Sequence, residues 1–107
     1  MPLMVVYNGP GVTREAYAPY EAEIRAGIVP AEALMHQVAF DEEGLVVVDV
    51  WTSRSAFEAW TESTIKPTLA RHKIPYIAPR VLDVEVVATP GASSHFALLK
   101  TPAPQPA

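Results

Sequence analysis

Residues 44–52, Gly-Leu-Val-Val-Val-Asp-Val-Trp-Thr, constrain the fold more than any other part of the sequence. Between Leu45 and Trp51 every residue except Asp49 is apolar, so a strand formed here would carry apolar side chains on both faces. Such a strand has to be covered on both sides. The carboxylate of Asp49 would then lie among hydrocarbon, where it needs a partner because an unpaired buried charge is costly.

The preceding segment predicts that partner. Residues 33–40 favour a second strand, and the Asp-Glu-Glu-Gly turn at 41–44 is typical of an antiparallel hairpin. If the turn closes between its first and last residues, His36 lies opposite Asp49, and facing side chains share one face of the sheet. A slip of one residue would send His36 to the opposite face. The same register gives two apolar pairs, Phe40 with Leu45 and Val38 with Val47.

The rest of the chain predicts two helices and two more strands. The order strand, helix, strand, strand, helix, strand is that of a ferredoxin-like α+β fold with a four-stranded antiparallel sheet. Helices can cover only one face of such a sheet, so we expect a homodimer in which two sheets pack face to face. The further elements are a strand over 3–8, a helix from Thr13 to about Gly27, a helix from Ser53 to Arg71 split at Pro67, and a half-exposed strand over 80–88.

We assign residues 1–88 to this domain and residues 89–107 to a C-terminal tail. The tail contains an apolar stretch, 95–99, that we expect to dock against the protein. Its last seven residues, 101–107, include three prolines and are expected to be disordered.

Composition excludes several kinds of function. The formal net charge of −4 and the scattered Lys and Arg residues argue against nucleic-acid binding. The absence of cysteine excludes disulfides, thiolate nucleophiles and iron–sulfur clusters. Three histidines far apart in sequence do not predict a metal site. Because neither a signal peptide nor a membrane-spanning run is visible, we expect a cytoplasmic protein without membrane contact.

The motif Val48-Asp49-Val50-Trp51-Thr52-Ser53-x-x-x-Phe57 resembles the dimeric α+β barrel superfamily, and its nearest branch is similar to the antibiotic-biosynthesis monooxygenases. The resemblance spans roughly residues 3 to 88. It implies a homodimeric barrel whose internal pocket is walled by Trp51. The superfamily includes cofactor-free anthrone monooxygenases, polyketide cyclases, haem-degrading oxygenases and muconolactone isomerases.

The functional residues of these subfamilies carry over only in part. The anthrone monooxygenases use an Asn and a Tyr at the positions of Val47 and Phe57, neither of which can hydrogen-bond a substrate. The haem ligand falls on the Thr-Glu pair at 61–62, so no haem is expected. The Tyr and His of an olivetolic-acid-type cyclase fall on Ser63 and Leu69. The resemblance therefore predicts a pocket rather than one activity.

Our first hypothesis is a cofactor-independent enzyme acting on an apolar aromatic or polyketide-like molecule. His36 would abstract a proton with one ring nitrogen while Asp49 orients the other, and the product would arise by cyclisation, isomerisation or dehydration. The residues expected to bind the substrate are Trp51, Val47, Val38, Phe57, Tyr20 and Arg71.

Two alternatives stay open. The same proton abstraction could feed a reaction with oxygen, which would make the protein a quinone-forming monooxygenase. The protein could also be a non-catalytic ligand-binding or dimerisation module, in which His36 and Asp49 only fix the strand register.

Overall fold

The computed structural model describes residues 2–86, 88–90 and 96–98 of the 107-residue chain. The first half of the fold consists of β1 (Leu3–Pro10), α1 (Arg14–Ala26), β2 (Ala33–Asp41) and β3 (Gly44–Trp51). The second half consists of α2 (Arg54–Trp60), a π-helical segment (Thr61–Ile65), α3 (Lys66–Arg71), β4 (Arg80–Asp83), β5 (Ala88–Pro90) and β6 (Phe96–Leu98).

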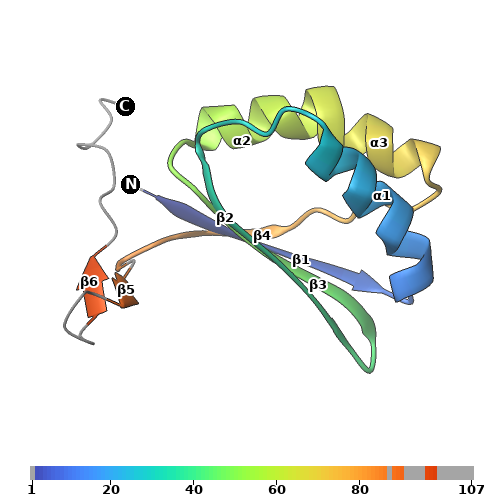
Figure 1. The fold of residues 1–107 in the computed structure, drawn as a ribbon, viewed down its shortest axis with the longest axis horizontal. Coiled ribbons are helices and arrows are strands. Elements are labelled where there is room, and N and C mark those ends of the chain that lie inside the picture. The colour runs from blue at the N-terminus through green and yellow to red at the C-terminus, as the bar shows by residue number, and fades with distance from the viewer. Residues whose placement is uncertain (1, 87, 91–95, 99–107) are drawn as a thin grey trace.

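The first four strands form one antiparallel sheet in the order β2-β3-β1-β4. The helices lie together over one face of this sheet (Figure 1). The fold is therefore α+β with a four-stranded antiparallel sheet, and it is compatible with the predicted ferredoxin-like arrangement. In the described part of the chain, no helix is long and apolar enough to cross a membrane.

The hairpin of β2 and β3 has the predicted register. Asp41 pairs with Gly44, and His36 pairs with Asp49. The turn is held by the Asp41 carboxylate, which accepts hydrogen bonds from the backbone N–H groups of Glu43 at 2.8 Å and Gly44 at 3.0 Å. Because the turn fixes which residues face each other, the prediction that His36 and Asp49 share a face is confirmed.

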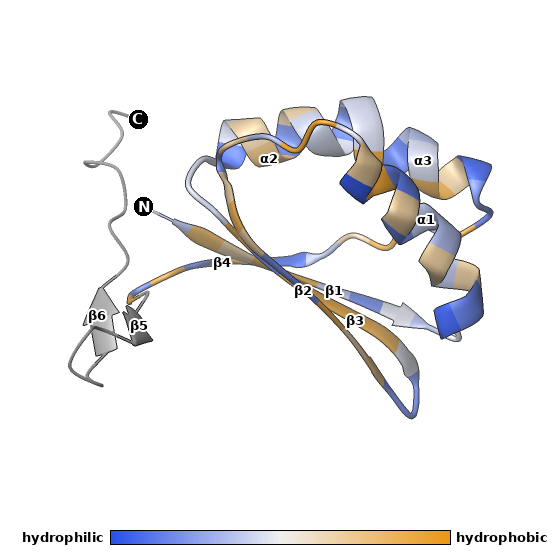
Figure 2. Cartoon of the chain, viewed as in Figure 1, coloured by the Kyte–Doolittle hydropathy of each residue, from blue (hydrophilic) through white to orange (hydrophobic). Residues whose placement is uncertain are grey.

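The core lies between the sheet and the helices. On β3 the side chains of Leu45 and Trp51 are 2% and 1% exposed, and Figure 2 shows that most of this strand is hydrophobic. From the other side, α1 contributes Tyr17, Tyr20 and Ile24, which recur at helical spacing and are all buried. These three side chains form the inner face of the first helix.

The second predicted helix is interrupted before Pro67 rather than at it. Proline has no backbone N–H to donate to the preceding turn, and the chain accommodates this with the wider π-helical segment. There the backbone N–H of Lys66 bonds to the carbonyl of Thr61, five residues earlier. The extra residue in this turn changes which side chains face the sheet.

The prediction of a strand over 80–88 is wrong beyond Asp83. β4 pairs with β1, and Asp83 lies opposite Leu3, the first residue of that strand. The backbone N–H of Val84 still bonds to the carbonyl of Pro2 at 2.9 Å, but Glu85 and Val86 belong to no strand. The chain then enters β5, which pairs with β6 in a separate two-stranded sheet.

The structure describes only part of the predicted C-terminal tail. Within the stretch 95–99, β6 pairs with β5, whereas His95 and Leu99 lie outside the described residues. The predicted disorder of 101–107 also lies outside them. The domain boundary at residue 88 stays a prediction.

The turn makes a stability prediction. Gly44 has a φ of +139°, and a Cβ atom there would come within 2.5 Å of the carbonyl oxygen of Gly9. Gly11 also has a positive φ, +78°, but a Cβ there would meet nothing within 4 Å. Urea denaturation should show that Gly44→Ala lowers the free energy of unfolding by about 3 kcal/mol, against about 1 kcal/mol for the control Gly11→Ala. Equal losses for the two variants would contradict a packing role for the Gly44 turn.

Candidate functional site

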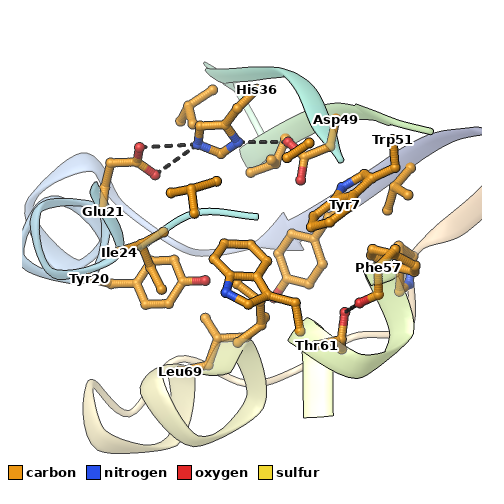
Figure 3. A pocket seen from close by; sticks show the side chains of 18 of the residues that line it. Tyr7, Tyr20, Glu21, Ile24, His36, Asp49, Trp51, Phe57, Thr61 and Leu69 are labelled. Atoms are coloured by element: carbon orange, nitrogen blue, oxygen red, sulfur yellow. Dashed lines mark hydrogen bonds and ion pairs between the residues drawn. The ribbon is translucent and has the colours of Figure 1, made fainter. Parts of the chain in front are cut away.

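A cavity of about 490 Å³ lies between the sheet and the helices. Its wall is largely apolar and aromatic, which is typical of small-molecule sites. Figure 3 shows side chains from β1, β2, β3 and the helices converging on it. Seven residues predicted to act in a site line this cavity: His36, Asp49, Trp51, Val47, Val38, Phe57 and Tyr20.

The predicted histidine–aspartate pair forms part of the cavity wall. Nδ1 of His36 lies 2.6 Å from Oδ1 of Asp49. The two side chains come from facing positions on β2 and β3, so the hairpin register alone brings them together. The Asp49 side chain is 20% exposed and that of His36 is 39% exposed, so the ring can be reached from solvent.

The sequence analysis did not identify Glu21 as a third member of this group. The Nε2 atom of His36 lies 3.0 Å and 3.1 Å from the two carboxylate oxygens of Glu21 (Figure 3). A signal was present in the sequence, because Glu21 follows Tyr17 by four residues and precedes Ile24 by three on the inner side of α1. We call Glu21, His36 and Asp49 the carboxylate–imidazole cluster.

This cluster corrects the expected protonation of His36. The hydrogen bond to Asp49 raises the pKa of His36 from 6.5 to about 9; burial opposes this rise, and the hydrogen bond to Glu21 adds to it. At neutral pH the ring is therefore an imidazolium that donates both N–H groups to carboxylates. The expectation of a neutral base with one unoccupied ring nitrogen is wrong for the resting protein.

A tyrosine holds the Glu21 carboxylate in place. The Tyr17 hydroxyl donates a hydrogen bond to Oε1 of Glu21 at 3.0 Å. Burial, followed by the nearby charge of Glu21, raises the pKa of Tyr17 far above its usual value, so its hydroxyl keeps the proton. Tyr17, Glu21, His36 and Asp49 thus form one continuous hydrogen-bonded chain from α1 to β3.

Two other donors on the cavity wall lack a partner among the described residues. The indole N–H of Trp51 is buried and finds no acceptor within hydrogen-bond distance among the described residues. Trp51 lies two residues after Asp49 on β3, so the two side chains share the cavity face of the sheet. The Tyr20 hydroxyl points into the cavity and makes no hydrogen bond within the described part of the chain (Figure 3). A bound ligand could therefore place an acceptor against these two groups.

The helical wall of the cavity differs slightly from the prediction. Phe57 faces the cavity as expected, and so does Trp60; each of their rings lies 5.6 Å from the Trp51 ring. Beyond Trp60 the π-helical segment places Thr61 and Ile65 on the wall, where a regular helix continuing from Phe57 and Trp60 would place Thr64. The Thr61 hydroxyl donates to the Phe57 carbonyl at 2.8 Å.

Arg71 does not reach the cavity. Its guanidinium bonds to the carboxylate of Glu23 and, at 3.3 Å, to the hydroxyl of Thr68. Nε2 of His72 lies 2.9 Å from the same Glu23 carboxylate, so these residues tie α3 to α1. Among the described arginines and lysines, Arg25 in the last turn of α1 lines the cavity.

No protein-family model, curated protein or solved structure matches the chain. The described residues contain no group of three or more His, Cys, Asp and Glu side chains placed to hold a metal ion. The chemistry of the site is therefore inferred from the residues that line it.

The carboxylate–imidazole cluster makes a prediction about pH. In a ¹⁵N NMR titration, the pKa of His36 should lie near 9. Asp49→Asn removes the largest cause of this rise and should lower the His36 pKa most. Because the folded-state pKa lies above the unfolded value of 6.5, the stability that the cluster contributes is fully present below pH 6.5 and is lost as pH rises through about 9. Wild type should therefore lose stability relative to His36→Gln over that range. A His36 pKa near 6.5 would contradict the cluster.

Proposed function

We propose that this protein is a cofactor-independent enzyme that transfers a proton on a flat, apolar small molecule. The observation that carries the proposal is the carboxylate–imidazole cluster, a group of titratable side chains in the wall of an otherwise apolar cavity. The aromatic walls suit an aromatic or polyketide-like substrate, which is also what the resemblance to the dimeric α+β barrel superfamily implies.

The protonation state of His36 determines the most economical mechanism. A substrate carbonyl oxygen would take the place of the Glu21 carboxylate at Nε2 and receive a hydrogen bond from the imidazolium. The proton on the adjacent carbon then becomes more acidic, and the released carboxylate of Glu21 accepts it. Asp49 keeps the ring in position and stabilises its charge throughout. The resulting enolate, held by the hydrogen bond from the imidazolium, can lead to cyclisation, isomerisation or dehydration.

The unpartnered donors support the same assignment. A second oxygen of the substrate could accept hydrogen bonds from the Trp51 indole and the Tyr20 hydroxyl, which would otherwise stay without partners on binding. The flat part of the molecule would pack against the rings of Trp51 and Phe57.

Proton transfer can be tested with a simple ketone. The enzyme should accelerate exchange of the α-protons of 2-tetralone in D₂O, followed by ¹H NMR, and His36→Gln should slow this exchange by about 10²–10⁴-fold. The matched control His72→Gln changes a histidine outside the cavity and should retain the wild-type rate. Exchange by His36→Gln at the wild-type rate, or no acceleration by wild type, would contradict the proposal. Oxygen uptake coupled to substrate loss would instead identify a monooxygenase.

We also propose that two copies associate through the sheet face opposite the helices, as in a ferredoxin-like α+β barrel dimer. On this face the strands carry apolar side chains that are only partly covered within the single chain. A symmetric pairing of two such faces would cover both sides of β3. The side chains concerned are Met4, Val6, Val46, Val48 and Leu82.

The oligomeric state tests this face. Val48 lies opposite Val6 near the middle of the sheet, so Val48→Lys would place a charge in the proposed interface. Analytical ultracentrifugation should show a dimer for wild type and a monomer for this variant. Ala18→Lys, which adds the same charge on the exposed side of α1, should stay dimeric. A monomeric wild type would rule the interface out.

A further inference from the structure

The carboxylate–imidazole cluster contains more negative than positive charge. The Glu21 and Asp49 side chains are 16% and 20% exposed, and His36 alone lies between them. Arg25 also lines the cavity, but it is exposed at the end of α1, where water screens its charge. A ligand head group that enters here therefore meets a net negative site.

The hydrogen bonds of the cluster leave acceptors unfilled. Both N–H groups of His36 are used, one by Asp49 and one by Glu21. The Tyr17 hydroxyl supplies one more donor to Glu21. Two carboxylates together can accept about eight hydrogen bonds, and the Oδ2 atom of Asp49 receives none from the described residues. A ligand fills these positions only if it brings donors.

We infer that Glu21 determines the specificity of the site for a flat ligand whose head group donates hydrogen bonds, a hydroxyl or an ammonium group, and that it excludes carboxylates. The inference rests on the proposed function in placing the ligand in this cavity, but it requires no turnover. Nothing in the sequence analysis assigned a role to this residue.

Glu21 rather than Asp49 has this role because of its position. Asp49 bonds to Nδ1, the nitrogen that faces along the sheet toward β3, whereas Glu21 covers Nε2 from α1. A ligand carboxylate could reach the imidazolium only by displacing the Glu21 carboxylate and then lying beside it. Like charges at such a distance repel strongly in a partly buried site. A hydroxyl or ammonium group can instead donate directly to Glu21.

Three naphthalene probes that differ only in the head group test this inference. Isothermal titration calorimetry at pH 7 would compare 2-naphthol, 2-naphthylmethylamine and 2-naphthoate. Wild type should bind at least one of the two donors about tenfold or more tightly than the carboxylate. Whichever of 2-naphthol and 2-naphthylmethylamine binds more tightly shows whether the site prefers a hydroxyl or an ammonium group.

Variants assign the effect to Glu21. Glu21→Gln keeps an oxygen for Tyr17 and removes the charge, so it should strengthen 2-naphthoate binding by about tenfold and weaken binding of the amine. If circular dichroism shows that Glu21→Gln folds poorly, Glu21→Met takes its place. Methionine has a similar length and no charge, so this variant should also lose the discrimination between head groups. The control Glu15→Gln removes a charge from the exposed start of the same helix and should bind all three probes as wild type does.

Three results would overturn the inference: 2-naphthoate binding to wild type as tightly as the better donor, a preference unchanged within twofold in both Glu21 variants, or no binding of any probe. Discrimination that is present without any proton exchange on 2-tetralone would overturn only the proposed function. If proton exchange on 2-tetralone depends on His36 while the Glu21 variants leave probe binding unchanged, only this inference would be overturned.

Discussion

The hydrogen bond between His36 and Asp49 is the contact on which the rest of the structure depends. Asp49 is the one carboxylate in an otherwise apolar central strand, and without a partner it would oppose the burial of that strand. Its partner comes from the facing position on β2, so only the observed register of the hairpin gives Asp49 this partner. That register turns Val47 and Trp51 toward the helices and thereby builds the cavity wall around the same pair.

Glu21 changes the chemistry of this pair. The hydrogen bond to Asp49 is the largest cause of the raised pKa of His36, but with Asp49 alone the second ring nitrogen would have no partner. A second carboxylate at Nε2 favours the charged ring, and the chain of hydrogen bonds then runs from the sheet into α1 through Tyr17. The position of the helix over the sheet is thus coupled to the protonation of one side chain, and a ligand that displaces Glu21 acts on both.

Local patterns in the sequence predict the features that depend on neighbouring residues. The two strand-forming segments and the turn at Asp41 were sufficient to place His36 opposite Asp49. The helix over α1 was predicted as well, but not that Glu21 would meet His36, because that contact depends on how the helix crosses the sheet. The end of β4 depends on where β1 begins, and the π-helical segment shifts the wall by one residue near Pro67. Neither feature leaves a periodic signal in its own segment.

The two kinds of polar group on the cavity wall make opposite demands on a ligand. Trp51 and Tyr20 present donors without acceptors, whereas Glu21 and Asp49 present acceptors that exceed the donors near them. Aromatic packing can supply affinity for many flat molecules, because apolar burial is not directional. Each polar group left unpaired on binding costs about 1–3 kcal/mol, so a molecule that satisfies only one of the two regions loses much of that affinity. Selectivity in this cavity should therefore come from the separation and polarity of two substituents on the ligand rather than from the shape of its apolar part.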